Sequence, residues 1–184
     1  MQIPPRTASS PDQASVYCRP DEEVAPHSSI APNIGFAVPN GTQRPKILFL
    51  CTGNSCRSHM AEGWAKALKP EVIEAYSAGT SPQGMNQIAI RVMAEVGVDI
   101  SGHSSKRPQA LGIGFDYVVT VCDAANESCP VFPARTHMIH VGFDDPPRLA
   151  RNAKSDDEAL CHYRRVRDEI KAFIQTLPES LTTR

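Results

Sequence analysis

Residues 46–58 read KILFLCTGNSCRS, and this stretch decides the fold. Its first part, Lys46–Leu50, is a short apolar run of the kind that a buried parallel strand shows. A polar loop follows, and behind it four apolar residues recur at helical spacing: Ala61, Trp64, Ala65 and Leu68. A strand, a tight loop and an amphipathic helix in this order predict the first unit of an α/β domain.

The same alternation continues to the end of the chain. Further strands are expected at 72–77, 115–122 and 136–143, where apolar and β-branched residues gather in short runs. Two more segments carry a helical apolar stripe, namely Ala89, Val92, Met93 and Val96 in one and Val166, Ile170, Phe173, Ile174 and Leu177 in the other. The pattern predicts an α/β fold, a small three-layer sandwich built on a four-stranded parallel sheet.

The composition is that of an ordinary globular protein. The 184 residues are 41% hydrophobic and 21% charged, and the formal net charge is −1. This balance argues against a protein that binds nucleic acid, and no apolar stretch approaches the ~18 residues that a membrane helix needs. Because the N-terminus also lacks the apolar core of a secretory signal, we expect a cytoplasmic protein. We further expect a monomer with neither a nucleic-acid nor a membrane partner.

Residues 1–45 differ from the rest of the chain. They hold eight of the 16 prolines, contain no lysine and show no apolar period. We interpret them as a disordered, Pro-rich N-terminal extension, followed by a single domain at 46–184. Cys18 lies in this extension and is interpreted as an exposed thiol without function.

The loop after the first strand has the spacing Cys-(x)5-Arg. A loop that feeds a helix N-terminus points successive backbone N–H groups inward and so forms a nest for a tetrahedral oxyanion. Gly53 permits close backbone approach, Asn54 tolerates a left-handed conformation, and Arg57 offers a planar fork to two oxyanion oxygens. The candidates for binding the oxyanion are the residues that follow the cysteine: Thr52, Gly53, Asn54, Ser55, Cys56, Arg57 and Ser58.

Cys51, at the floor of this loop, is the candidate nucleophile. The loop dipoles and Arg57 favour the thiolate and are expected to lower the pKa of Cys51, while Ser58 can donate a hydrogen bond to its sulfur. A nucleophile, an anion nest and an arginine at fixed spacing indicate chemistry on an oxyanion rather than a structural turn.

Cys122 ends the third expected strand, and Cys129 follows after the polar spacer DAANES. The spacer can form roughly two helical turns, which would hold the cysteines too far apart for a disulfide, whose Cα atoms lie within about 7 Å. Pairing would therefore require this segment to unwind. The spacing alone leaves two interpretations open, a redox switch or two buried small hydrophobic residues.

A zinc site made of Cys51, Cys56, Cys122 and Cys129 is the further alternative. The spacings Cys-x4-Cys and Cys-x6-Cys are not the tight pairs typical of structural zinc, and the arginine beside them suits an anion better than a cation. We therefore expect no metal at these cysteines.

Several motifs stand in order along residues 46–175: CTGNSCRS-x-MAEGWAK from Cys51, YSAG from Tyr76, VVTVC with CP seven residues on, GFDDP from Gly142 and RVRDEIK from Arg165. In these motifs the chain resembles the low-molecular-weight tyrosine phosphatase fold and, within it, the thioredoxin-coupled arsenate reductases. The resemblance implies arsenate as substrate, thioredoxin as reductant and no obligatory cofactor. It also favours the redox interpretation of Cys122 and Cys129.

The resemblance further implies a role for each catalytic residue. Cys51 attacks arsenate held by Arg57, Cys122 attacks the Cys51 sulfur, and Cys129 completes the relay as a Cys122–Cys129 disulfide. Asp145, the aspartate before the proline of GFDDP, is implied as the general acid that protonates the departing oxygen. Asp144 is the alternative, with a structural role in the loop.

A supporting network is implied behind the loop, formed by Asn54, Glu62, Ser77 and the region 103–106. In many relatives this network holds potassium with an aspartate where this chain has Lys106. Either the Lys106 ammonium replaces the monovalent cation or Lys106 faces solvent, and we predict no metal. His59 also departs from the glutamine common in the reductases.

Two other functions use the same residues. A phosphatase acting on phosphotyrosine would need Cys51, Arg57 and Asp145 but no cysteine relay, and it usually carries aromatic residues after Asp-Pro, where this chain has 147–149 PRL. A thiol-based binder of arsenite would need neither the arginine nor the acid. The sequence favours the reductase, with weak phosphatase side activity.

Overall fold

The computed structural model describes residues 43–182, and strand β1 (Lys46–Cys51) lies at the centre of its sheet. Strand β1 pairs in parallel with β2 (Glu74–Gly79) and with β3 (Tyr117–Thr120), and β3 pairs in parallel with β4 (His137–His140). The strand order is β2-β1-β3-β4. The predicted four-stranded parallel sheet is confirmed, although β2 begins two residues later than expected and β3 and β4 are shorter.

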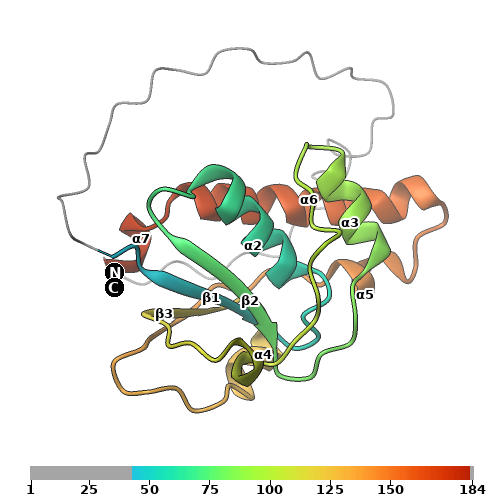
Figure 1. Ribbon diagram of the computed structural model, residues 1–184. Coiled ribbons are helices and arrows are strands. Elements are labelled where there is room, and N and C mark those ends of the chain that lie inside the picture. Colours follow the sequence, from blue (N-terminus) through green and yellow to red (C-terminus); the bar gives the residue numbers. More distant parts are fainter. Residues whose placement is uncertain (1–42, 183–184) are drawn as a thin grey trace, which may run out of the picture.

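Three helices, α2 (Arg57–Leu68), α3 (Gln87–Ala94) and α6 (Asp156–Gln175), cover one face of the sheet (Figure 1). The short helices α4 (Asp123–Glu127) and α5 (Pro146–Ala150) follow the carboxyl ends of β3 and β4. The 3-10 turn η2 (Pro108–Leu111) precedes β3, and α7 (Glu179–Thr182) ends the described chain. No helix within the described residues is long and apolar enough to cross a membrane.

Strand β1 is buried on both faces, which explains its unbroken apolar run. Ile47, Phe49 and Cys51 belong to the large core cluster beneath the helices. Leu48 and Leu50 point to the opposite face, where they pack in a smaller cluster with Phe115 and Val118. The sheet therefore separates a thick helical layer from a thinner layer made largely of loops and η2.

The predicted helical stripes are buried except at their ends. Leu68 at the end of α2 is 37% exposed, and Val96, which lies beyond α3, is 38% exposed. At both helices the apolar sequence pattern therefore continues beyond the residues that are buried against the sheet. On α6, Val166, Ile170 and Ile174 are fully buried and form the inner surface of that helix.

The interpretation of residues 1–45 as a disordered extension, and of Cys18 as an exposed thiol, falls outside the described residues except for 43–45. Two of those three, Arg44 and Pro45, contact the domain. Arg44 donates a hydrogen bond to Pro70 O and pairs with Glu74 at 3.7 Å, and Pro45 O accepts a hydrogen bond from the Glu74 amide.

Candidate active site

The loop between β1 and α2 has its carbonyl groups fixed by neighbouring segments. The carbonyl oxygens of Cys51, Thr52, Gly53 and Ser55 accept hydrogen bonds from backbone amides of residues 80–86. Those of 54 and 56 accept from the Ser105 hydroxyl and from the amide of residue 60. Because every carbonyl from 51 to 56 has a protein donor, the loop amides are left to serve an anion, as the nest requires.

Two residues make this loop conformation accessible. Asn54 has φ 41°, in the left-handed region that was predicted for it. Gly79, at the end of β2, lies against the loop so closely that a Cβ there would stand 2.6 Å from Thr52 O and 2.7 Å from Asn54 N. At Gly53 a Cβ would meet only the side chains of Gln83 and Ser55, at 3.2 Å. Gly79 is therefore the glycine that the neighbouring strand needs, while the close approach of an oxyanion to Gly53 stays a prediction.

The sulfur of Cys51 is buried under the loop. It accepts a hydrogen bond from the Asn54 amide at 3.1 Å, and the Ser58 hydroxyl lies 3.0 Å away. Burial nevertheless raises the pKa of the Cys51 thiol, and the hydrogen bond from Ser58 offsets this only in part. The expected lowering of the pKa is wrong for this arrangement, because Cys51 is 4% exposed and the guanidinium of Arg57 is turned toward Asp145.

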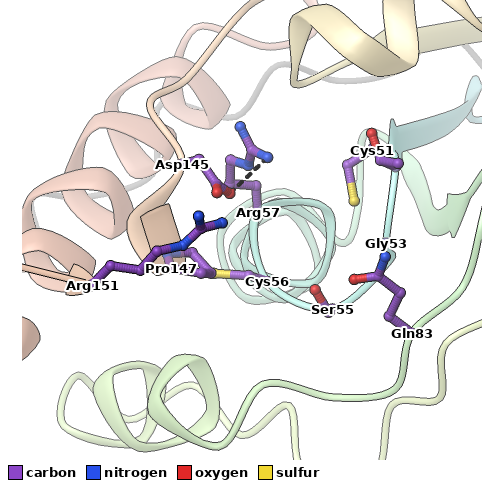
Figure 2. A pocket seen from close by; sticks show the side chains of 10 residues that line it. Cys51, Gly53, Ser55, Cys56, Arg57, Gln83, Asp145, Pro147 and Arg151 are labelled. Atoms are coloured by element: carbon purple, nitrogen blue, oxygen red, sulfur yellow. Dashed lines mark ion pairs between the residues drawn. The ribbon is translucent and has the colours of Figure 1, made fainter. Parts of the chain in front are cut away.

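A cavity of about 290 Å³ opens above the loop (Figure 2). The loop residues that line it are Cys51, Thr52, Gly53, Ser55, Cys56 and Arg57. Asn54 and Ser58 are wholly buried, and both contact the Cys51 sulfur. That they also bind the substrate stays a prediction.

Arg57 and Asp145 form an ion pair in the lining of the cavity (Figure 2). One guanidinium nitrogen, Nη2, lies 2.9 Å from Asp145 Oδ1, and the other, Nη1, donates to Phe143 O at 2.9 Å. The second oxygen of Asp145 accepts the Arg148 amide and so caps helix α5. Asp144 instead pairs with Arg165 at 2.9 Å and does not line the cavity. The geometry thus separates the two adjacent carboxylates.

The two candidate relay cysteines lie on different faces of the sheet. Cys122 is buried in the helical-layer core at the start of α4, and its sulfur is 3.5 Å from the Thr52 hydroxyl of the loop. Cys129 lies beyond α4, is half-buried, and packs against the thinner layer. The spacer forms one helix of five residues. Both thiols are free.

A chain of polar contacts runs behind the loop, as predicted. The Asn54 side-chain amide donates to Ser58 Oγ at 3.0 Å and to Ser77 Oγ at 3.1 Å. Ser77 in turn donates to Glu62 Oε2 at 2.5 Å. Cys51 is thereby linked to the buried carboxylate of α2.

Lys106 enters this network through its backbone only. Its amide donates to Asn54 Oδ1 at 2.8 Å, whereas its ammonium donates to Ser104 O at the surface. The alternative in which the ammonium replaces a monovalent cation is therefore wrong. The set does not fit potassium either, because Asn54 Oδ1 already accepts that amide and imidazole nitrogens, which suit transition metals, face Glu62 Oε2.

Sequence reasoning missed three residues that line the cavity: Gln83, Pro147 and Arg151. Gln83 lines the side formed by the segment after β2, and Arg151 reaches the cavity mouth just after helix α5, beside Pro147 (Figure 2). Gln83 follows YSAG at the carboxyl end of a parallel strand, which is where ligand-binding loops gather. Arg151 has no comparable signal in the sequence.

Comparison with known proteins agrees with this geometry. Residues 46–184 match the family described as low molecular weight phosphotyrosine protein phosphatase. The arsenate reductase of Halalkalibacterium halodurans is 45% identical over 135 residues, which cover 73% of this chain and 95% of that protein. The arsenate reductase of Bacillus subtilis is 44% identical over 71% of this chain and 95% of its own length.

Among solved structures, an arsenate reductase in its phosphate-binding state is 30% identical, with a TM-score of 0.58 over 75% of this chain and 99% of that one. An arginine phosphatase from Geobacillus stearothermophilus is 26% identical, with a TM-score of 0.56 over 76% of this chain and 94% of that one. The fold is therefore shared by reductases and phosphatases.

Proposed function

Because the chain belongs to the arsenate reductases of the low molecular weight phosphotyrosine protein phosphatase family, we propose that it reduces arsenate through a relay of Cys51, Cys122 and Cys129. The observation that carries the proposal is the position of Cys122, whose sulfur lies 3.5 Å from the hydroxyl of Thr52, next to the nucleophile in the chain. A phosphatase has no use for a second buried thiol there.

The first step forms a bond between sulfur and arsenic. The Cys51 thiolate attacks arsenate, and a hydroxyl group of the arsenate leaves as water after accepting a proton from the Asp145 carboxylic acid. Arg57 must leave Asp145 to bind the arsenate oxygens, so the incoming anion itself frees the acid. Once Arg57 has moved, its charge and the loop dipoles favour the Cys51 thiolate.

The next two steps are thiol exchanges. The Cys122 thiolate attacks the Cys51 sulfur, the sulfur–arsenic bond breaks with its electron pair on arsenic, and arsenite leaves. Cys129 then attacks Cys122, which releases the Cys51 thiolate and forms a Cys122–Cys129 disulfide. Because Cys129 packs on the other face of the sheet, helix α4 must unwind before this attack.

Thioredoxin is proposed as the dithiol that reduces this disulfide. Two electrons taken from its thiols regenerate Cys122 and Cys129 and balance the two electrons given to arsenic. Cys129 is half-buried whereas Cys122 is 4% exposed, so the sulfur that an external thiolate can reach is Cys129.

Arsenate-dependent oxidation of reduced thioredoxin by the purified protein tests this proposal. The wild type should turn over many times, while Cys129→Ser should stop after one turnover and accumulate a Cys51–Cys122 disulfide in a peptide map. Cys56→Ser is the matched control, because Cys56 lines the cavity but has no place in the relay. Multiple turnover by Cys122→Ser or Cys129→Ser would refute the relay.

Phosphatase action on aryl phosphates is the second candidate function, since Cys51, Arg57 and Asp145 would serve it equally. Cys122→Ser and Cys129→Ser should leave that activity intact, because neither thiol is needed to bind or cleave a phosphoester. Measuring both activities on the same variants therefore separates the two chemistries.

A further inference from the structure

Three metal-ligand side chains meet behind the loop, and none of them lines the cavity. His59 and Glu62 come from helix α2, and His103 comes from the segment before η2. One ligand atom of each lies within 4.8 Å of the others. His59 and Glu62 are buried, and the His103 side chain is 15% exposed.

The separations are close to those that one ion would impose. Glu62 Oε2 lies 3.6 Å from His103 Nδ1 and 3.8 Å from His59 Nδ1. Ligand atoms about 2.1 Å from a tetrahedral zinc ion lie roughly 3.4 Å apart. The His103 nitrogen and the carboxylate oxygen therefore lie close to the spacing of two zinc ligands. His59 Nδ1 also contacts Ser77 Oγ at 3.1 Å, so the His59 ring would bind an ion either by giving up this contact or through Nε2.

Two ring nitrogens in this cluster are buried without a hydrogen-bond partner. They are His59 Nε2 and His103 Nδ1. Buried polar atoms in folded proteins are nearly always paired, so an unpaired one calls for an explanation such as a bound ion. His103 Nδ1 faces the Glu62 carboxylate at a distance too long for a hydrogen bond, which is the arrangement that an intervening cation accounts for.

The contacts of Glu62 divide its two carboxylate oxygens. Lys66 pairs with Oε1 at 2.6 Å. The other oxygen, Oε2, accepts the Ser77 hydroxyl at 2.5 Å and is the one that faces the two rings.

We propose that His59, Glu62 and His103 bind a divalent transition-metal ion, with zinc as the intended ion. Two imidazoles and one carboxylate are ligands that zinc accepts and that an alkali cation does not favour. The poor fit of this network to potassium is thus explained by the two histidines. The site is independent of the cysteine relay, because it uses no thiol.

The ion would stabilise the substrate loop from behind. Glu62 is joined to the loop through Ser77, Asn54 and Ser58, the last of which contacts the Cys51 sulfur. Fixing the carboxylate fixes the first member of this chain. We therefore expect bound zinc to raise the thermal stability of the domain without entering the reaction.

The experiment is a titration of the chelator-treated full chain with Co²⁺, followed by absorption spectroscopy, and with Zn²⁺, followed by thermal unfolding. The wild type should bind one Co²⁺ with a spectrum of nitrogen and oxygen ligands, and Zn²⁺ should raise its unfolding temperature. His59→Gln and His103→Gln should each weaken Co²⁺ binding by at least about tenfold. The matched control, His137→Gln on strand β4, should bind as the wild type does.

Three outcomes would overturn the proposal. The first is an absence of Co²⁺ binding up to about 1 mM, a concentration at which the binding free energy is only about 4 kcal/mol. The second is unchanged Co²⁺ binding by His103→Gln. The third is a sulfur-to-cobalt charge-transfer band, which would assign the ion to the cysteines. If the fully buried His59→Gln variant does not fold, His103→Gln decides alone, because its side chain reaches the surface.

Discussion

Arg57 Nη2 lies 2.9 Å from Asp145 Oδ1, so the residue proposed to bind the substrate and the residue proposed to protonate it hold one another. The pair joins the first turn of α2 to the N-cap of α5, at the mouth of the cavity. An oxyanion that binds Arg57 competes with Asp145 for the same guanidinium. In the proposed mechanism, substrate binding and release of the acid are therefore one event.

Replacing Asp145 should separate binding from turnover. In Asp145→Asn the guanidinium of Arg57 loses its anionic partner and becomes available, so phosphate should inhibit at equal or lower concentration. The same change removes the general acid and should lower kcat by about 10²–10⁴-fold. Steady-state kinetics with phosphate as competitive inhibitor give both numbers. An unchanged kcat would show that Asp145 is not the acid, and Asp144→Asn, which breaks only the Arg165 pair, is the control.

Cys51→Ser should abolish arsenate reduction and aryl-phosphatase activity together. A serine hydroxyl is not ionised at neutral pH, and no thiol remains to bond arsenic. Because Cys51 is buried under the loop, circular dichroism must first establish that the variant is folded. Detectable turnover of either substrate would contradict the assignment of the nucleophile.

Gly79→Ala, at the end of strand β2, should distort the loop between β1 and α2. The added Cβ would stand 2.6 Å from Thr52 O and 2.7 Å from Asn54 N, and both partners are backbone atoms that cannot rotate away. We expect a loss of about 1–3 kcal/mol of unfolding free energy and a marked fall in kcat/KM. Gly102→Ala, where a Cβ meets nothing within 4 Å, should change neither. Urea unfolding and the reduction assay measure the two effects.

The ion pair between Glu95, at the end of α3, and Arg164 of α6 should make the free energy of unfolding fall at acid pH. Arg164 donates to both Glu95 oxygens, at 2.7 and 2.8 Å, and this lowers the pKa of Glu95 in the folded state. A lowered pKa gives stability that is present above the unfolded pKa near 4.5 and is lost as pH falls through the folded value. Glu95→Gln should cost up to about 1 kcal/mol at pH 7.

At pH 3 the same substitution should cost less, and urea unfolding at the two pH values gives the comparison. Glu71→Gln, at an exposed residue, is the control substitution. A loss equal at both pH values would mean that the Glu95 side chain acts through packing rather than through its charge.

A chain that begins at Gln43 should fold and keep its activity. Residues 1–45 show no apolar period, and the contacts of Arg44 with Pro70 and Glu74 would be retained. Thermal unfolding of the two chains side by side is the measurement. A markedly lower unfolding temperature for the shorter chain would show that the proposed extension docks on the domain.

The sequence predicted those parts of the molecule that depend on local pattern. The apolar run of β1, the left-handed Asn54 and the order of strand, loop and helix all follow from neighbouring residues, and the structure confirms them. The contacts that complete the site join distant segments. Arg57 pairs with Asp145, and Gly79 packs against Thr52. The partners in each contact are far apart in the sequence, so no short-range pattern predicts the contact.

The direction of a side chain and its burial also depend on distant segments. Of the two alternatives for Lys106, the solvent-facing one holds, because its side chain turns back to Ser104 and only its amide reaches the network. The pKa of Cys51 was inferred from the loop dipoles, while burial by the surrounding core raises it. Depth of burial and side-chain direction are set by the whole fold, and a motif records neither.

The sheet divides the relay, with Cys122 in the helical-layer core and Cys129 in the thinner layer with Phe115 and Phe132. If these sulfurs join as proposed, Cys129 has to leave its apolar neighbours, and the segment that contains α4 has to rearrange with it. The oxidised and reduced proteins then differ in outline at this surface as well as in one covalent bond. A reductant docking on that face can recognise its substrate by shape before any sulfur is exchanged, and it can leave the reduced form alone.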